Sequence, residues 1–315
     1  MNRITGMDVE PGLSIVIRSY NTGPMTLEEV RRFFAEEIHY FANVKNPALV
    51  AAFQSVPREK FVGPGPWKIG LTGFVETPDA DPRHVYHNLP ISLDESRNLN
   101  NGQPGALAVW IDALELKTGE RVYHLGGGVG YYDAILAEVV GRTGAVVVTE
   151  VDTDLAARAQ GNLANYANVT VHAVDGSEFD PGDCDAILIN AGCTHLDPCW
   201  LDRLRDGGRL MVPLTIKTEV PGMASERQAN LGAGRMVKVV RHGHSFTAAA
   251  HSPIAIFSCT SMRDAGSEAN LRKAMGKGLI AKLQSVRRDP HQPDETCVLH
   301  RNDVCLSAAF SAVKP

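Results

Sequence analysis

The chain alternates between strand-like and helix-like segments from residue 119 to residue 215, and this alternation strongly limits the folds open to it. The predicted strands span 121–125, 145–150, 168–174, 184–190 and 207–214, and the predicted helices span 130–141, 153–166 and 196–206. The strands are short, apolar and mostly unalternating, which is typical of parallel strands covered by helices on both faces. We therefore predict an α/β protein with a doubly wound, mostly parallel sheet.

A glycine-rich turn follows the first predicted strand. Gly126, Gly128 and Gly130 stand where the strand ends and a helix begins. Backbone N–H groups converge at such a turn, and glycine lets a charged or polarised ligand come close to them. The dinucleotide fingerprint would need a glycine at Tyr131, so the loop departs from that pattern. The turn indicates a nucleotide-like cofactor without fixing which one.

Acidic residues end the next two predicted strands. Glu150 can accept hydrogen bonds from both hydroxyls of a ribose, which nicotinamide enzymes and S-adenosylmethionine (SAM) enzymes both require. Asp175 can accept from an adenine amino group, and Gly176 would let the ring lie flat on the backbone. Ligands of open α/β sheets bind beyond the carboxyl ends of the strands. We therefore expect a nucleoside cofactor at this edge of the sheet.

The composition excludes some classes of partner and site. With 31 basic and 36 acidic side chains the net charge is −5, which gives no broad attraction to nucleic acid or to an anionic membrane. The chain has neither a signal-peptide pattern at its start nor an apolar run long enough to span a bilayer, so we expect a cytoplasmic protein without membrane contact. None of the six cysteines forms a C-x-x-C pair, and we expect neither a disulfide framework nor a bound metal.

Further elements are predicted on both sides of the alternating segment. Residues 26–44 begin with the capping-box spacing of Thr and Glu and form an amphipathic helix, and a short helix follows at 47–55. The Pro- and Gly-rich stretch from there to about residue 104 is a long loop region, which we interpret as a lid over a ligand. After residue 215, the runs 234–243 and 252–261 should pair antiparallel at one sheet edge. A helix near 267–285 and strands at 296–300 and 303–308 follow.

From about residue 45 to residue 260, the sequence resembles the class I SAM-dependent methyltransferases, and within them the protein-L-isoaspartate O-methyltransferase family. The resemblance is carried by VPREKFV at 56–62, LPI at 89–91, the glycine loop and its helix at 126–141, and the segments 149–163, 174–177 and 185–214. VPREKFV and the last segment are the most specific. The resemblance implies a Rossmann-like methyltransferase core at 106–262, an N-terminal helical and acceptor-side region at 1–105, and a C-terminal extension at 263–315.

The resemblance also implies the cofactor and its site. SAM would be the methyl donor and S-adenosyl-L-homocysteine (SAH) the product. The predicted cofactor-binding residues are Gly126, Gly128, Gly130, Tyr131, Glu150, Val151, Asp175 and Gly176.

Two positions depart from the family pattern. His124 stands where the family usually has an acidic residue, and Gly102 stands where the family has a serine that lines the isoaspartyl pocket. Residues 63–85 also form a longer connection than the family needs, and about 50 residues follow the usual end of its fold. Cofactor use is compatible with these changes, whereas the methyl acceptor stays open.

Candidate acceptor-side residues lie in the 98–104 loop and after the fourth predicted strand. Asn101 and His195 are the catalytic candidates, and His195 would take a proton if the acceptor were a hydroxyl or an amine. A carboxylate acceptor is already ionised at neutral pH and needs no general base. The candidates for substrate binding are Asn100, Gln103, Asn190 and Thr194.

Four functions fit these observations to different degrees. The first is repair methylation of isoaspartyl carboxylates in proteins, and the second is modification of a peptide or small-molecule natural product, which the altered 98–104 loop favours. A non-catalytic module that binds SAM or SAH is a third. A nicotinamide oxidoreductase is the fourth, and Tyr131 in place of glycine disfavours it. The sequence leaves the oligomeric state open.

Overall fold

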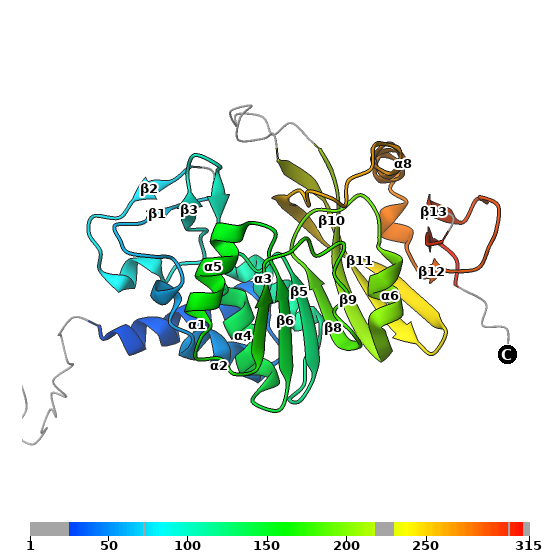
Figure 1. Cartoon of the computed structure of the whole chain (residues 1–315). Helices are drawn as coiled ribbons and strands as arrows, with labels where there is room; N and C mark the ends of the chain where they lie inside the picture. Colours follow the sequence, from blue (N-terminus) through cyan, green and yellow to red (C-terminus); the bar gives the residue numbers. More distant parts are fainter. Residues whose placement is uncertain (1–24, 72, 218–229, 302, 311–315) are drawn as a thin grey trace, which may run out of the picture.

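One long sheet organises the molecule (Figure 1). The computed structural model describes residues 25–71, 73–217, 230–301 and 303–310. Within these residues the sheet has ten strands in the order β13-β14-β12-β11-β10-β9-β8-β5-β6-β7. Its parallel half consists of β5 (Arg121–Leu125), β6 (Ala145–Thr149), β7 (Val169–His172), β8 (Cys184–Ile189) and β9 (Leu204–Lys217). The predicted parallel α/β sheet is confirmed.

Helices cover both faces of the sheet. Successive strand residues point to opposite sides, and the apolar ones on each side need a covering layer. The helices are α1 (Leu27–Ala42), α2 (Pro47–Ser55), α3 (Pro104–Ala113), α4 (Tyr131–Val140), α5 (Thr153–Asn162), α6 (Pro198–Arg203) and α8 (Ala265–Gly276). Val122, Val146 and Leu188 pack in one core with α1 to α5, whereas Tyr123 and Ile187 pack in a second core with α6 and α8. The sheet is therefore doubly wound, as expected.

Helix α3 was not predicted, and three helices are shorter than predicted. Most of the α3 surface is buried and apolar, so its sequence lacks the polar face that marks an amphipathic helix. Helix α6 stops at Arg203 because β9 starts at Leu204 to pair with β8. The predicted helix at 267–285 ends at Gly276, since Gly278 follows with a left-handed φ of 67°. Helix α5 likewise ends at Asn162 rather than residue 166.

The antiparallel half of the sheet is larger than predicted. The expected pair is present as β10 (Leu231–His242) and β11 (Ser245–Phe257), which form a long hairpin beside β9. The strands β12 (Ser285–Arg287), β14 (Cys305–Ser307) and β13 (Cys297–His300) continue the sheet beyond β11. The C-terminal extension thus packs on the sheet edge, at the opposite end of the molecule from α1 and α2 (Figure 1).

The segment before α3 folds against the carboxyl ends of the parallel strands. Its short elements are η1 (Arg58–Lys60), β1 (Lys68–Ile69), β2 (Val75–Glu76), η2 (Pro82–Val85), β3 (Ser92–Asp94) and β4 (Leu99–Asn100).

The predicted capping box of α1 is present, with the Glu29 N–H donating to Thr26 Oγ1 and the Thr26 N–H donating to the Glu29 carboxylate. None of the described helices has the length and apolar character needed to cross a membrane.

Candidate functional site

A cavity of about 1220 Å³ lies at the carboxyl ends of the parallel strands. Its wall includes the segments that follow β5 (125–129), β6 (149–152) and β8 (190–191). The loop at 97–103 and the β11 segment at 253–257 also line it. Pockets for small ligands usually measure about 300–1,000 Å³, so this cavity has room for a cofactor together with part of a second substrate.

The glycine loop between β5 and α4 has a backbone that side chains would not tolerate. Gly126, Gly128 and Gly130 have φ values of 86°, 58° and 92°, in the left-handed region that favours glycine. At Gly127 a Cβ would lie 2.3 Å from Val148 Cγ1 and 2.8 Å from Asp133 Oδ2. Gly126 to Gly128 line the cavity, whereas Gly130 precedes α4 and starts it. The loop therefore presents its backbone to the cavity on one side and packs against Val148 and Asp133 on the other.

Glu150 stands beside this loop with its carboxylate held by backbone donors. The Gly128 N–H donates to Oε2 at 2.7 Å, and the Asp152 N–H donates to Oε1 at 3.0 Å. Burial raises the pKa of Glu150, although these two hydrogen bonds oppose the shift. Each carboxylate oxygen can accept a further hydrogen bond, so Glu150 retains the capacity to bind a pair of ribose hydroxyls. Val151, which follows it, also lines the cavity.

Asp175 and Gly176 line the cavity after β7, as predicted. Burial acts to raise the pKa of Asp175, but hydrogen bonds from Ser177 and Ser261 outweigh it and lower the pKa below its usual value. A Cβ at Gly176 would lie 2.5 Å from Thr149 Oγ1. A side chain at this position would therefore displace its neighbours, and the hydrogen-bond acceptor Asp175 lies next to it.

Tyr131 and His124 lie behind the cavity rather than on its wall. Tyr131 is buried and packs edge-on against Phe61, with ring centroids 5.5 Å apart. His124 is fully buried, and its Nδ1 lies 2.5 Å from Asp133 Oδ1 in the first turn of α4. Position 124, just before the glycine loop, has a histidine and not an acidic residue. The carboxylate beside it belongs to Asp133 of α4. This buried pair links β5 to α4, the helix that follows the glycine loop.

Asn101 lines the cavity with a buried, unpaired donor. Its Oδ1 accepts a hydrogen bond from the Ile91 N–H at 2.8 Å, and Arg58 Nη2 lies 3.5 Å from the same oxygen. Its Nδ2 is buried and has no hydrogen-bond partner. Leaving a buried donor unpaired costs free energy, so a ligand that accepts from this nitrogen would be favoured.

Arg58 supports this loop and was not predicted as a functional residue. Its guanidinium is fully buried and donates to the carbonyl oxygens of Val85, His87 and Leu89 at 2.6–2.8 Å. The ring of Tyr131 lies 5.8 Å from the guanidinium carbon. Arg58 belongs to the VPREKFV motif, so the motif gave a signal for the position but not for its role.

Gly102 has a conformation that a serine would strain. Its φ is 74°, and a Cβ would lie 3.1 Å from Leu107 Cδ2. Asn100 Oδ1 accepts from the Gly102 N–H at 2.9 Å, and Gln103 Nε2 donates to the Asn88 carbonyl at 3.2 Å. Asn100, Gly102 and Gln103 all line the cavity. Glycine at position 102 thus gives the loop a backbone conformation that a serine would adopt only with strain.

The residues predicted after β8 divide into two groups. Asn190 lines the cavity and donates through Nδ2 to the Gly126 carbonyl at 3.3 Å. Thr194 and His195 are not on the cavity wall. Thr194 Oγ1 accepts from the Asp264 N–H at 3.0 Å and contacts His195 Nδ1 at the same distance. Burial lowers the pKa of His195.

Arg263 also lines the cavity, and sequence reasoning missed it. Nη1 donates to Thr215 Oγ1 at 3.0 Å, and Nη2 pairs with Glu268 at 2.6 Å. Its Nε is buried without a partner. Only the packing of the segment after β11 against β9 brings this side chain to the cavity, so no local sequence pattern could have identified it.

The site and the sheet together define a class I SAM-dependent methyltransferase. A parallel sheet with an antiparallel hairpin, a glycine loop after its first parallel strand and an acidic residue after the next one are the features of that class. The residues also fit the cofactor, because the glycine positions leave room for a ligand and Glu150 keeps unused acceptor capacity.

Comparison with known proteins shows the family. Residues 31–241 match the family model described as protein-L-isoaspartate(D-aspartate) O-methyltransferase, and the chain belongs to this family. The protein-L-isoaspartate O-methyltransferase 1 of Archaeoglobus fulgidus is 32% identical over 199 residues, which cover 62% of this chain and 84% of that protein. The protein-L-isoaspartate O-methyltransferase of Methanosarcina mazei is 29% identical over 191 residues, or 59% of this chain and 71% of that protein.

Solved structures share the fold. A protein-L-isoaspartate O-methyltransferase superposes with a TM-score of 0.57 at 20% identity, covering 78% of this chain and 69% of that one. A Plasmodium falciparum structure described as a protein of this family in complex with SAH gives 0.55 at 15% identity, covering 73% and 98%. The family match makes the chain a SAM-dependent methyltransferase, and its sheet continues past the end of that match.

Proposed function

We propose that the protein methylates a free carboxylate of a peptide or protein, and that an isoaspartyl carboxylate is its acceptor. SAM supplies the electrophilic methyl group when it is bound. We assign cofactor binding to the predicted residues on the cavity wall, which are Gly126, Gly128, Glu150, Val151, Asp175 and Gly176. Gly130 and Tyr131 would act by shaping the loop and the start of α4. The names of the relatives support this class of acceptor.

The unpaired amide of Asn101 is the observation that carries the proposal. The hydrogen bond from the Ile91 N–H to Oδ1 fixes the orientation of the amide, which leaves Nδ2 as a buried donor without a partner on a residue that lines the cavity. An ionised carboxylate only accepts hydrogen bonds, so it complements this donor. A protonated amine offers only donors and does not. The site thus favours an acidic acceptor over a basic one.

The reaction chemistry agrees with this assignment. Methyl transfer is an in-line displacement, so the residues must hold the acceptor oxygen about 3 Å from the methyl carbon and exclude water. A carboxylate oxygen is already a nucleophile at neutral pH, and no proton needs to be removed. The position of His195 away from the cavity wall is compatible with a reaction that needs no general base.

The 98–104 loop supports a second candidate, which is methylation of a carboxylate in a dedicated peptide substrate. Gly102 replaces the serine of the family's pocket, and its φ of 74° gives the loop its own shape. The segment before this loop also contributes Gly70, Phe74 and Leu93 to the cavity wall. Such a wall would select the chain around the carboxylate rather than the reacting group itself.

Kinetics of an Asn101→Ala variant would test the proposal. Losing a hydrogen bond to a charged group costs about 1.5–3 kcal/mol, so we expect kcat/KM for the acceptor peptide to fall roughly 10- to 100-fold. The SAH dissociation constant should not change, because Asn101 is assigned to the acceptor. As a matched control, Asn168→Ala removes an amide that contacts only the end of α4, and it should leave both constants unchanged. Unchanged kcat/KM in Asn101→Ala would refute the role of this amide.

A further inference from the structure

Two cysteines and two histidines of the C-terminal extension come together at the outer edge of the sheet. His291 lies in the loop before β13, Cys297 and His300 belong to β13, and Cys305 begins β14. One potential ligand atom from each residue lies within 4.8 Å of those of the other three. All four residues follow residue 241, where the family match ends, so the family relation does not account for them.

The distance between one cysteine and one histidine of this cluster matches a tetrahedral zinc site. Zinc binds cysteine sulfur at about 2.3 Å and histidine nitrogen at about 2.0–2.1 Å, which places neighbouring sulfur and nitrogen ligands about 3.6 Å apart. Cys297 Sγ lies 3.5 Å from His291 Nε2. The imidazole rings of His291 and His300 have centroids 4.7 Å apart at an interplanar angle of 77°, so they meet edge to face rather than stacking.

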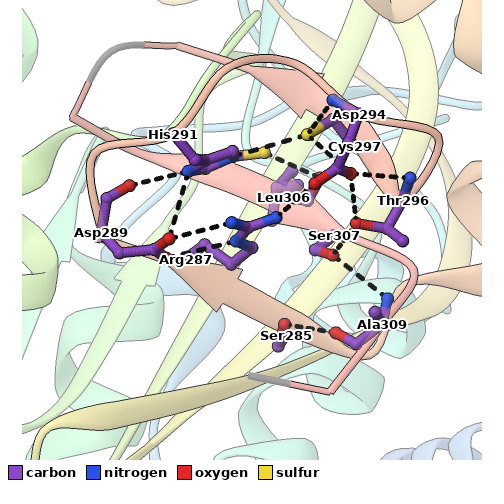
Figure 2. A network of polar contacts seen from close by, with 11 residues as sticks. Ser285, Arg287, Asp289, His291, Asp294, Thr296, Cys297, Leu306, Ser307 and Ala309 are labelled. Carbon is purple, nitrogen blue, oxygen red and sulfur yellow. Dashed lines mark hydrogen bonds and ion pairs between the residues drawn. The ribbon is translucent and has the colours of Figure 1, made fainter. Parts of the chain in front are cut away.

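The surrounding hydrogen bonds prepare these side chains to bind a cation. His291 Nδ1 donates to the Asp289 carbonyl at 2.7 Å, so that Nε2 is the acceptor atom of the neutral imidazole, and Nε2 is directed at Cys297 (Figure 2). The Asp294 N–H donates to Cys297 Sγ at 3.3 Å, and the same sulfur lies 3.4 Å from Asp294 Oδ1, so Asp294 fixes the position of this thiol. The Nδ1 atom of His300 is buried and has no hydrogen-bond partner, so this imidazole has unused capacity to bind a ligand.

A salt-bridged loop holds this arrangement in place. Arg287 forms ion pairs at 2.9 Å with both Asp289 and Asp294, the residues that contact His291 and Cys297 (Figure 2). Asp294 also accepts from the Thr296 N–H at 2.9 Å. The loop is therefore positioned by contacts that do not involve the four candidate ligands, and such a second layer is what preorganises a metal site.

We propose that His291, Cys297, His300 and Cys305 bind one Zn²⁺ ion with a structural role. Two thiolates and two imidazoles are a ligand set that suits zinc, and four protein ligands leave no open position for catalysis. None of the four residues lines the cofactor cavity. The strands that the ion would join have only three or four residues each, so a metal cross-link would stabilise an edge that has few backbone pairings. Binding would release the thiol proton of each cysteine to solvent.

The competing arrangement is a disulfide between Cys297 and Cys305. It would join the same two strands, but it would leave His300 Nδ1 unpaired and give His291 no role. The two arrangements exclude each other, because a disulfide removes both thiolates. They also differ in mass and in metal content, so one preparation can distinguish them.

The experiment measures the metal content of the full chain purified under reducing conditions. We expect about one zinc per chain by elemental mass spectrometry, together with thiolate-to-cobalt charge-transfer absorption after exchange with Co²⁺. Removing the metal with a chelator should lower the melting temperature by several degrees and leave the SAH dissociation constant unchanged. Reduced, folded protein that takes up neither zinc nor Co²⁺ would overturn the proposal, as would an intact mass showing a Cys297–Cys305 disulfide.

Variants then assign the ligands. Cys297→Ser and Cys305→Ser should lose the metal, whereas Cys199→Ser, which changes a partly buried cysteine of α6, should retain it. His300→Ala should lose the cobalt spectrum, and His300→Cys should keep one with stronger thiolate bands. Equal zinc content in Cys297→Ser and wild type would refute the assignment. If the serine variants fail to fold, the metal content and cobalt spectrum of the wild-type chain decide.

Discussion

The buried pair of His124 and Asp133 gives a stringent prediction about what holds the cofactor loop. Both side chains have no solvent exposure, and the atoms His124 Nδ1 and Asp133 Oδ1 are 2.5 Å apart. In an Asp133→Ala variant, His124 loses its only described partner while its environment stays apolar and closed to water. Removing one member of a fully buried pair costs about 3–5 kcal/mol, because the remaining polar group stays desolvated. Solvent screening does not reduce this figure where neither partner is exposed.

The effect is measured by urea unfolding at pH 7. With a slope near 3 kcal/mol per M, the expected loss moves the midpoint down by about 1–2 M. Asp180→Ala is the matched control, because Asp180 pairs with Arg203 on the surface and such pairs contribute about 0–1 kcal/mol. The double variant His124→Leu/Asp133→Ala should recover part of the loss, since no buried polar group is then left alone. If Asp133→Ala is no less stable than Asp180→Ala, the reasoning is refuted.

Three further predictions concern the cavity and its support. Because burial raises the pKa of Glu150, this carboxylate takes up a proton at a higher pH than a free glutamate. Calorimetry should therefore show SAH affinity falling as the pH is lowered toward 5. The Glu150→Gln variant should bind SAH about 10- to 100-fold more weakly, with little pH dependence. A pH-independent wild-type affinity would contradict this. Gly176→Ala should lose about 1–3 kcal/mol of stability in chemical denaturation, because its Cβ meets Thr149 at 2.5 Å, whereas Gly161→Ala, with open space around it in α5, should not be destabilised. Arg58→Met should cost about 3 kcal/mol of unfolding free energy, since the carbonyl groups of Val85, His87 and Leu89 lose their buried donor, and it should raise the KM for the acceptor more than the dissociation constant of SAH. Equal stability of Arg58→Met and Arg203→Met, a surface control, would show that the loop does not depend on Arg58.

Features that depend on local sequence could be predicted. The strands before the glycine loop and before Glu150 are apolar runs that end in turn residues, and their carboxyl ends meet because parallel strands share a direction. On this basis the sequence predicts that five residues lie together, and all five line the cavity: Gly126, Gly128, Glu150, Asp175 and Gly176. The helix α1 was likewise indicated by its own capping residues.

Features that depend on distant contacts could not be predicted. Thr194 follows β8 as Asn190 does, but the chain turns there toward the 262–264 segment, and Thr194 bonds to Asp264 instead of facing the cavity. Arg58 acquires its role only because the 85–89 segment wraps around it. The zinc proposal also departs from the expectation of no metal, because that expectation rested on C-x-x-C spacing. The four residues are instead brought together by the pairing of β13 with β14 and by the preceding loop.

The most direct test of the account is methyl transfer from labelled SAM to an isoaspartyl peptide, measured beside its normal aspartyl twin and without enzyme. Our account predicts label on the isoaspartyl peptide alone, in a form that mild base releases as methanol, since the product is a methyl ester. It also predicts that Asn101→Ala reduces this transfer while SAH binding persists. Equal labelling of both peptides, or no labelling by protein that binds SAH, would contradict the proposed acceptor.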